Sequence, residues 1–571
     1  MPLKRFFQNT TFLCTALLIT PHFSTPSLAQ EDAPKWEGHI EAEGKISNDR
    51  SIGEGSVFIP VWQNDTSMLF TDIRGKFDNR DSEEMNLGLG YRQQINNNWI
   101  LGGYAFYDRR NSGNDNTFHQ ATIGVEAMTE DLEFRVNGYI PESTEEEIGS
   151  GTSTAAINGG NFQIQNYSAP KERALPGVDV EVGKGFYLPD NWEVWAYAGG
   201  YHFDASGYED VTGPRGRVEI SKNFDNGMRF TAGLESQTDD VRGGQTFGIA
   251  RLRVPFSAFG GGDKTPSRSL SKLDQRMTTR IIRDVDIVSA ERQGQLESTE
   301  TATFELGSGT KVSSFTTLDS TSDLDVDVAA AGANSLVVLD GSNGIINTPE
   351  AVMGQTGQTI IGGGASITVT GANGTTANVT LPGSRPTVNS TIVGFTHPAF
   401  FPGTDGTDGT VQNMIITGNE LGIAFNSRDR ATIRDLIIRD TGDDSIRIVN
   451  ADDVTIENVS VYRPDGGNEE AIQIGSAPFD TFNNITIKDF YAEDANIGIL
   501  VASGGTVNNL TLENVTMDQV GNVLETQNGF PGGTINTVSG AITATNVTGA
   551  NCVNNGTITG STLTINGVAC P

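Results

Sequence analysis

Leu132-Glu-Phe-Arg-Val-Asn137 alternates strictly between apolar and polar side chains, and the same alternation returns many times along residues 37–256. Successive side chains of a β-strand point to opposite faces, so each such segment predicts a strand with one apolar face and one polar or charged face. Twelve such segments can be counted, an even number, each near the ~10 residues that a tilted strand needs to cross a bilayer. They begin near His39, Gly53, Met68, Met85, Trp99, His119, Leu132, Val178, Trp192, Arg215, Met228 and Gln245.

The connections between these segments favour a membrane barrel over a soluble β-sandwich, which would give the same alternation with its apolar face inside. Every second connection is a tight turn, such as Asn96-Asn-Asn98, whereas one of the others runs from about Pro141 to Pro176. Short turns at one end and longer loops at the other are typical of outer-membrane barrels. Aromatic residues near strand ends suit the headgroup zone. They are Trp62, Tyr91, Trp99, Tyr107, Trp192, Phe203, Phe224 and Phe256.

The polar faces would line the lumen of a barrel, which must be closed because lipid offers no water to a sheet edge. These faces carry charges of both signs, and we expect opposite charges to hydrogen-bond across the lumen rather than to select a permeant ion. The predicted inward-facing residues are Glu133, Arg135, Asp179, Glu181, Arg217, Glu219, Arg229, Glu235, Arg251 and Arg253.

The N-terminus has the parts of an export signal. Lys4 and Arg5 form a positive region, an apolar run follows over residues 12–19, and Ser27-Leu-Ala29 offers the small residues that a signal peptidase reads. We therefore expect a signal peptide over residues 1–29, with a membrane anchor as the alternative.

Composition excludes several classes of site. The net charge is −33, with 38 basic and 71 acidic residues, so a nucleic-acid partner is not expected. Three cysteines without a Cys-x-x-Cys pair exclude an ordinary zinc ribbon or iron–sulfur site. Cys14 leaves with the signal. Cys552 and Cys570 remain for an oxidising compartment, where they either form a disulfide that closes the C-terminal tip or stay as free thiols.

Several motifs of the barrel segment resemble a known family. They are Trp99-Ile-Leu-Gly-Gly-Tyr-Ala-Phe-Tyr-Asp-Arg109, Phe118-His-Gln-Ala-Thr-Ile-Gly-Val-Glu126 and Ala174-Leu-Pro-Gly-Val-Asp-Val-Glu-Val-Gly183. They are similar to the barrel of the intimin/invasin inverse autotransporters, and the likeness extends over about residues 37–290. This resemblance implies a twelve-stranded barrel in outer-membrane lipid, inserted by the barrel-assembly machinery, that leads a C-terminal passenger out through its own pore.

A linker with a short pore helix is expected over residues 257–300. Residues 257–268 are rich in Gly, Ser and Pro. Apolar residues then recur at helical spacing, among basic ones. We expect this segment to plug the charged lumen; a surface helix in the periplasm is the alternative. The apolar residues are Leu270, Leu273, Met277 and Ile281, and the basic ones are Lys272, Arg276, Arg280 and Arg283.

Residues 301–571 repeat a short unit and predict a parallel β-helix, in which stacked coils bury a continuous internal ladder. From Val388 onward the copies start 23, 22, 23, 26 and 25 residues apart, with a second strand such as Ser445-Ile-Arg-Ile448 after each of several copies. Resemblance of residues 335–345 and 358–364 to pectate-lyase-like proteins implies a right-handed coil. The copies after the first are Val411-Gln-Asn-Met-Ile-Ile416, Ile433-Arg-Asp-Leu-Ile-Ile438, Ile456-Glu-Asn-Val-Ser-Val461, Phe482-Asn-Asn-Ile-Thr-Ile487 and Val507-Asn-Asn-Leu-Thr-Leu512, with Asn413, Asp435, Asn458, Asn484 and Asn509 at one place.

Gly442-Asp-Asp-Ser445 is the sharpest candidate for a catalytic site. Polygalacturonase-like β-helices carry a similar Gly-Asp-Asp before a strand, and paired carboxylates can act as acid and base in glycoside hydrolysis. The His and the Arg–Lys pair of that family have no match, since His397 is the one His after residue 202. Acidic pairs recur at Glu469-Glu470 and Glu493-Asp494, so we interpret this turn as a solvated edge. The alternatives are a catalytic pair, Asp443 and Asp444, or a weak calcium site at Asp443, Asp444, Glu469 and Glu470.

The sequence thus predicts an all-β protein: a signal peptide (1–29), an outer-membrane β-barrel (30–256), a linker (257–300) and a right-handed parallel β-helix (301–571). We expect a cell-surface adhesin that binds an extracellular carbohydrate or a host-surface ligand, with no cofactor. A surface-tethered polysaccharide-degrading enzyme is the second hypothesis. A pore with its β-helix folded in the periplasm is the third.

Overall fold

The computed structural model describes residues 35–48, 50–259, 270–284, 286–392, 398–403, 408–418, 421–462, 469–475, 480–529 and 531–570. The predicted signal peptide and His397 lie outside these residues. The chain forms two compact units. The first contains residues up to Ile148 together with Pro170–Gln293, and the second contains Gly149–Ala169 together with the residues from Gly294 on. None of the helices in the described part of the chain has the length and apolarity needed to cross a bilayer.

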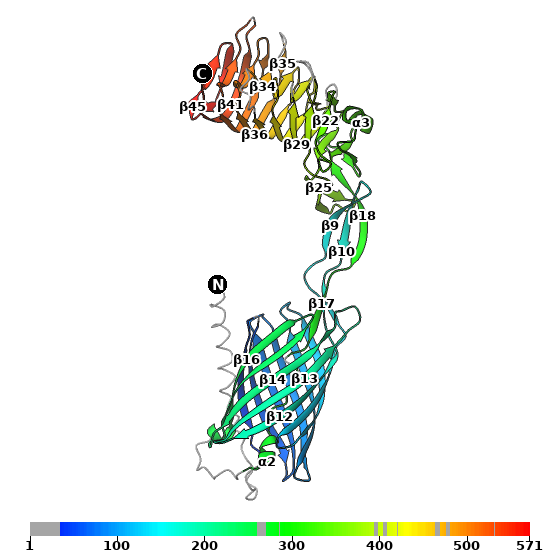
Figure 1. Ribbon diagram of the computed structural model, residues 1–571, viewed down its shortest axis with the longest axis vertical. Helices are drawn as coiled ribbons and strands as arrows, with labels where there is room; N and C mark the ends of the chain where they lie inside the picture. The colour runs from blue at the N-terminus through cyan, green and yellow to red at the C-terminus, as the bar shows by residue number, and fades with distance from the viewer. Residues whose placement is uncertain are drawn as a thin grey trace. The chain divides into compact units, whose positions relative to one another are not determined.

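The first unit holds a closed barrel of twelve antiparallel strands, as predicted (Figure 1). β1 pairs with β16, so that His39 lies opposite Pro255 and Ile46 opposite Gly248. Each strand begins within four residues of its predicted start. The strands are β1 His39–Ile46, β2 Ser51–Gln63, β3 Ser67–Asp78, β4 Glu83–Ile95, β5 Trp99–Asn111, β6 Thr117–Met128, β7 Leu132–Pro141, β12 Gly177–Leu188, β13 Trp192–Phe203, β14 Val211–Asn223, β15 Arg229–Asp239 and β16 Gly243–Pro255; the 3-10 turn η1 Phe256–Phe259 follows.

The apolar faces of these strands point away from the barrel interior. On β12, Val178, Val180 and Val182 are 43–50% exposed, whereas Asp179 and Glu181 between them are buried. The soluble sandwich is therefore wrong: this closed sheet turns its charged face inward and its apolar face outward, which suits lipid outside.

Most of the predicted headgroup aromatics are exposed near strand ends. Trp62, Trp99, Trp192 and Phe224 are 37–52% exposed at the end of the barrel that carries the tight turns. Phe203 is the exception, because it is fully buried in a cluster with Tyr139, Leu175, Tyr201 and Val211, among others. Its predicted place in the headgroup zone is wrong.

The longest connection, between β7 and β12, contains four short strands of its own: β8 Glu145–Glu147, β9 Thr152–Asn158, β10 Asn161–Tyr167 and β11 Lys171–Ala174. In the first unit, β11 pairs with β8 on one side and with β17 (Ser289–Arg292) on the other. In the second unit, β9 and β10 form a hairpin whose β10 pairs with β18 (Leu296–Glu305). β18 also pairs with β19 (Lys311–Val312) and β25 (Ser366–Gly371), and β25 pairs with β26 (Thr376–Thr380).

The second unit is built around a parallel β-solenoid, which confirms the predicted fold class (Figure 1). Its main sheet contains in spatial order β20 Thr316–Leu318, β21 Leu336–Leu339, β24 Thr359–Gly362, β29 Thr410–Gly418, β31 Thr432–Arg439, β33 Thr455–Tyr462, β36 Ile485–Glu493, β39 Leu510–Asp518 and β41 Thr534–Thr545. Its second sheet contains β23 Val352–Met353, β28 Phe400–Phe401, β30 Ile423–Asn426, β32 Ile446–Val449, β34 Glu470–Ile474, β37 Ile497–Val501, β40 Asn522–Thr526 and β42 Cys552–Asn554. Short strands complete the coils: β22 Ile346–Thr348, β27 Thr387–Ser390, β35 Thr481–Phe482, β38 Thr506–Val507, β43 Thr557–Ser561, β44 Thr564–Ile565 and β45 Val568–Ala569.

One hydrophobic core runs through the solenoid. Ile433, Ile456, Ile487 and Leu512 stack on successive coils of the main sheet, and all are fully buried. Burying each side chain of this size contributes about 1.5–3 kcal/mol. Helix α3 (Leu324–Ala331) adds Leu324 and Val328 to this core beside the first coils.

The register of the last repeats differs from the prediction. The sequence copies align Ile456 with Phe482, but in the structure Ile456 lies opposite Ile487, so this coil is 31 residues long. The chain between the two strands is longer here, and its added residues shift the apparent repeat.

As a result, the polar ladder at the third place of each unit has different members from those predicted. They are Asn413, Asp435, Asn458, Asp489 and Asn514, all with φ between 50° and 57°. Asn484 and Asn509 belong to a separate ladder, which begins at Asp453.

Candidate functional site: the occupied lumen and the acidic turn

The linker lies inside the barrel, but only a short part of it is helical. Helix α2 covers Lys272–Arg276 and begins with a capping box, in which Ser271 and Asp274 satisfy each other's backbone. Met277 and Ile281 lie beyond the helix, and with Leu273 they are still buried in one cluster with Phe58, Phe70 and Tyr104, among other barrel residues. The alternative of a surface helix is therefore wrong.

Side chains of the barrel wall satisfy the backbone of the linker beyond the helix. The described residues of this stretch, 278–284 and 286–288, belong to no strand, so their peptide groups need other hydrogen-bond partners once buried. Arginines donate to its carbonyl groups, and a tyrosine and a glutamate accept from its N–H groups. The contacts are Arg92 Nη1 to Met277 O and Thr279 O (both 2.7 Å), Arg74 Nη2 to Ile281 O (2.9 Å), Asp284 N to Tyr139 Oη (2.6 Å) and Ile287 N to Glu84 Oε2 (2.9 Å).

Charged side chains of the linker pair with wall residues of the opposite sign. A buried charge is expensive unless it is paired, so these contacts fix the position of the linker within the lumen. Two cavities of about 30 Å³ remain beside it. The pairs are Arg276 with Glu133, Arg280 with Glu41 (3.2 Å) and Glu54, Arg283 with Asp108 (2.8 Å), and Asp286 with Arg50 (2.6 Å).

The predicted inward-facing charges form ion pairs as expected, either with one another or with further charges of the wall. Arg135 contacts Glu133 at 2.7 Å and Arg217 contacts Glu181 at 2.7 Å. The remaining pairs are Arg251 with Glu219 (3.2 Å), Arg253 with Glu41 (2.6 Å), Arg215 with Asp179 (3.5 Å), Glu235 with Lys45 (2.8 Å) and Arg229 with Glu193.

Sequence reasoning missed some of the inner charges, notably Glu41, Glu43, Arg92 and Glu126. These residues show the same alternation of polar and apolar residues as the predicted ones: on β1, for example, Glu41 and Glu43 alternate with Ile40 and Ala42.

The linker runs from the turn end of the barrel to the end that carries the 142–176 connection, called here the loop end. At the turn end, Trp36 Nε1 donates to Asp274 O (3.0 Å) and Gln94 Nε2 donates to the Asp274 carboxylate (2.8 Å). Near the loop end, Ile287 contacts Glu84 through its backbone N–H. Long loops of outer-membrane barrels face the outside, so the chain leaves the lumen on that side.

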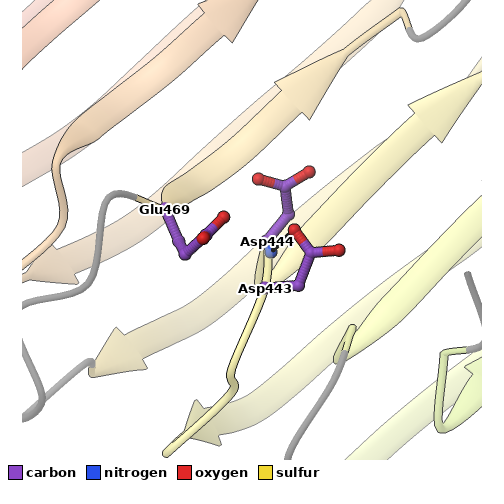
Figure 2. Close-up of side chains that lie close together, drawn as sticks. All are labelled: Asp443, Asp444 and Glu469. Carbon is purple, nitrogen blue, oxygen red and sulfur yellow. Dashed lines mark hydrogen bonds between the residues drawn. The ribbon is translucent and has the colours of Figure 1, made fainter. Parts of the chain in front are cut away.

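The acidic turn of the solenoid brings together three of the four residues predicted as a calcium site. Asp443, Asp444 and Glu469 each place a carboxylate oxygen within 4.8 Å of the others' (Figure 2). Asp443 and Asp444 belong to one turn, and Glu469 reaches them from the next coil. The register also places Glu470 beside Asp444, but it does not bring Glu493 or Asp494 to this column.

Arg447 occupies the acidic turn. Its Nη2 lies 3.0 Å from Asp443 Oδ1, and its Nε donates to Asp444 Oδ2 at 2.7 Å. Burial alone would lower the pKa of Arg447, but Asp444 and Asp443 raise it above its ordinary value, so the guanidinium is charged. The arginine therefore fills much of the acceptor capacity that a cation or a substrate hydroxyl would need.

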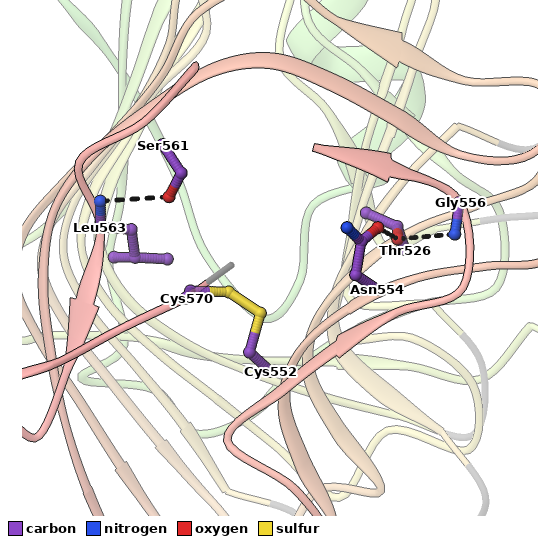
Figure 3. Close-up of a disulfide and its surroundings, with 7 residues drawn as sticks. All are labelled: Thr526, Cys552, Asn554, Gly556, Ser561, Leu563 and Cys570. Atoms are coloured by element: carbon purple, nitrogen blue, oxygen red, sulfur yellow. Dashed lines mark hydrogen bonds between the residues drawn. A yellow bond between two sulfur atoms is a disulfide. The ribbon is translucent and has the colours of Figure 1, made fainter. Parts of the chain in front are cut away.

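The C-terminal end of the solenoid carries a disulfide between Cys552 and Cys570, with Cα atoms 5.7 Å apart (Figure 3). Cys570 is buried in the solenoid core together with Leu563 and Ile565. This contact closes the tip over the last coil.

Comparison with known proteins finds one family that the barrel resembles. Residues 35–204 match the family model described as inverse autotransporter, beta-domain. No curated protein matches the chain. Similar solved structures include the translocator domain of autotransporter NalP from Neisseria meningitidis (12% identity, TM-score 0.24, covering 44% of this chain and 96% of that one). The beta domain of the Bordetella autotransporter BrkA is another (11% identity, TM-score 0.22, covering 38% and 96%).

The family match, the closed barrel and its occupied lumen all indicate an outer-membrane anchor that carries a passenger. The barrel resembles an inverse autotransporter beta-domain over residues 35–204; it lies in the outer membrane, and the β-solenoid is its surface passenger.

Proposed function

We propose that the protein is a surface adhesin, in which the solenoid binds carbohydrate on host or polysaccharide surfaces. The observation that carries this proposal is the path of the linker, which fills the lumen and leaves at the loop end as the start of the passenger. A barrel filled in this way serves as an anchor rather than as an open channel. By the resemblance of its motifs, the barrel-assembly machinery would insert it.

An aromatic and charged patch on the outer face of the main sheet supports a carbohydrate ligand. Tyr462 of β33 and Tyr491 of β36 lie with ring centroids 5.6 Å apart. Glu493 accepts a hydrogen bond from the Tyr491 hydroxyl at 2.8 Å, and Arg439 and Asp518 share the column of Tyr462 and Glu493. Aromatic faces stack on the apolar faces of sugar rings, while such charged groups bind their hydroxyls. We call these five residues the tyrosine patch.

The negative charge of the passenger favours neutral polysaccharides as the class of ligand. Residues 291–571 contain 10 basic and 31 acidic residues, which disfavours polyanionic ligands. Within the patch, burial and the bond to Glu493 raise the pKa of Tyr491 to about 12, so its hydroxyl stays neutral near pH 7.

Whole-cell binding tests the proposal. Cells that display the chain should bind fluorescent neutral polysaccharides, and deletion of residues 291–571 should abolish binding while the barrel stays in the membrane. Tyr462→Ala with Tyr491→Ala should weaken binding. The matched control is Lys311→Ala, which removes an exposed side chain away from the patch. Cells that bind equally well after the deletion would contradict the proposal.

Display itself is tested by labelling Lys488. It is the one lysine after Lys311, and its side chain is 43% exposed. A membrane-impermeant amine reagent should label it on intact cells. Labelling only after lysis would favour a solenoid in the periplasm.

A polysaccharide-degrading enzyme is the second candidate, because three carboxylates converge at the acidic turn. Asp443→Asn separates the two functions. A reducing-sugar signal from displaying cells that is lost in this variant would favour the enzyme, whereas absence of turnover in the parent leaves binding alone.

A further inference from the structure

One segment of the barrel's longest connection belongs to the passenger unit. Residues 149–169 leave the barrel unit between β8 and β11 and form the β9–β10 hairpin, which is part of the second unit. The hairpin turns at Gly159 and Gly160, with φ of 57° and 79°, which is typical of a tight two-residue hairpin turn. The pairing within the hairpin is therefore local, because it joins residues at most 15 apart in the sequence.

The hairpin offers β10 as an edge to the first strand of the passenger. β10 pairs with β18 from Gln163 opposite Thr301 to Tyr167 opposite Leu296. Further backbone bonds join Phe162 N to Ser313 O (2.9 Å) and Phe315 N to Gly160 O (3.0 Å), so the segment after β19 also docks on the hairpin.

Side chains of the hairpin complete a separate hydrophobic core. Phe162 and Ile164 are fully buried, and the Phe162 ring lies 5.3 Å from that of Phe315. The same cluster includes Phe304 of β18 and Val338 of β21, one of the first strands of the solenoid. The hairpin is thus packed against the passenger at the point where stacking of the coils begins.

The stem of the same connection pairs with the chain that has just left the lumen. β11 pairs with β17, so that Lys171 lies opposite Arg292, and both cations contact Glu145 of β8, at 3.3 and 3.4 Å. Within the next few residues the chain enters β18. The barrel connection therefore supplies a pairing partner both to the emerging linker and to the start of the passenger.

We propose that the β9–β10 hairpin is a folding template for the passenger. A solenoid coil cannot bury its apolar face alone, and parallel pairing joins residues far apart in the chain, so the first coil is slow to form. A hairpin tethered to the inserted barrel presents a ready strand edge and two apolar side chains at high effective concentration. β18 adds to this edge, and β21 and β24 then stack on the core so formed.

A pulse-chase experiment on the full chain tests the template. Phe162→Ala with Ile164→Ala should slow the rate at which the surface passenger becomes protease-resistant by roughly tenfold, because contacts of a folding nucleus act on the folding rate. The control is Thr152→Ala with Thr154→Ala, which changes exposed residues of β9 in the same hairpin. Heat-modifiable migration of the barrel in each variant verifies that the anchor is folded.

The order in which two disulfides form gives an independent measurement of which end of the passenger folds first. Gln163 and Thr301 lie opposite each other, so Gln163→Cys with Thr301→Cys places a reporter pair across the template, and Cys552–Cys570 reports on the far end. The template pair should close first. If Cys552–Cys570 closes first, or if the alanine variant acquires protease resistance at the parental rate, the proposal is overturned. Both readouts concern folding, so they are independent of whether the passenger binds a polysaccharide.

Discussion

Arg280→Ala should destabilise the barrel, because this residue holds the linker against three carboxylates of the wall. Arg280 contacts Glu41 at 3.2 Å, Glu43 at 3.7 Å and Glu54, and its side chain is only 9% exposed. Removal of one partner of a buried ion pair leaves an uncompensated buried charge.

The magnitude follows from which carboxylate is left without a partner. Glu41 keeps Arg253 at 2.6 Å and Glu43 keeps Arg251, so both remain paired. Among the described residues, Arg280 is the one cation within 4.0 Å of Glu54. Only the Glu54 carboxylate therefore loses its ion-pair partner. We expect the free energy of unfolding to fall by about 3 kcal/mol, near the lower end of the range for broken buried pairs. That corresponds to a roughly 100-fold change in the folding equilibrium.

Tryptophan fluorescence measures this loss in the full chain. All five tryptophans, Trp36, Trp62, Trp99, Trp192 and Trp195, belong to the barrel unit, so urea titration in detergent reports on that unit alone. The same substitution at Arg439, whose side chain is 49% exposed on the solenoid, is the control and should leave the midpoint unchanged.

A second variant distinguishes charge from lost packing. Arg280→Ala with Glu54→Gln should recover about 1–2 kcal/mol, because a buried amide costs less than a buried unpaired carboxylate. Equal midpoints for the Arg280 and Arg439 variants, or no recovery with Glu54→Gln, would refute the argument that the lumen is held by paired charges.

Three further predictions concern the solenoid, and far-UV circular dichroism with limited proteolysis measures each. Ile456→Ala should cost about 2–5 kcal/mol, because the side chain is fully buried between neighbouring coils. Cys552→Ser with Cys570→Ser opens an 18-residue loop and should cost about 3 kcal/mol, and reductant should have the same effect on the parent. Asn458→Leu should cost about 2 kcal/mol because of its φ of 51° and its lost bond to Asp435 (2.7 Å), and Asn458→Gly should cost less.

The barrel could be predicted nearly strand by strand because the two faces of each strand lie in different environments. Lipid selects apolar residues on one face and the packed, charged lumen selects polar ones on the other, so the signal repeats every second residue. The linker is predicted in the lumen for another reason, because its basic residues suit a charged interior. Its helix was predicted too long, because the spacing of Met277 and Ile281 also suits an extended chain against an uneven wall.

Pairings between distant residues could not be predicted in the same way. Asn161-Phe-Gln-Ile-Gln165 alternates like a strand, but its partner β18 follows more than a hundred residues later, and nothing local indicates the pair. The predicted register of β36 was wrong because the longer coil before this strand contains a second Asn-rich segment, at Asn483 and Asn484, that resembles the repeat. The role of Arg447 was open to prediction, since it follows Asp443 and Asp444 by four and three residues.

Alternation by itself does not decide whether a strand faces lipid or an internal core, but one local feature separates the two units. In the barrel, residues with positive φ, such as Asn96 and Asp190, lie in turns between strands. In the solenoid, Asn458 and its equivalents have positive φ inside strands. Such a residue shifts the alternation by one, so that Ile456 and Val459, three apart, both point into the core. An Asn or Asp at the third place of a six-residue unit, after a polar second residue and with apolar residues at the first and fourth places, therefore favours a solenoid coil over a membrane strand.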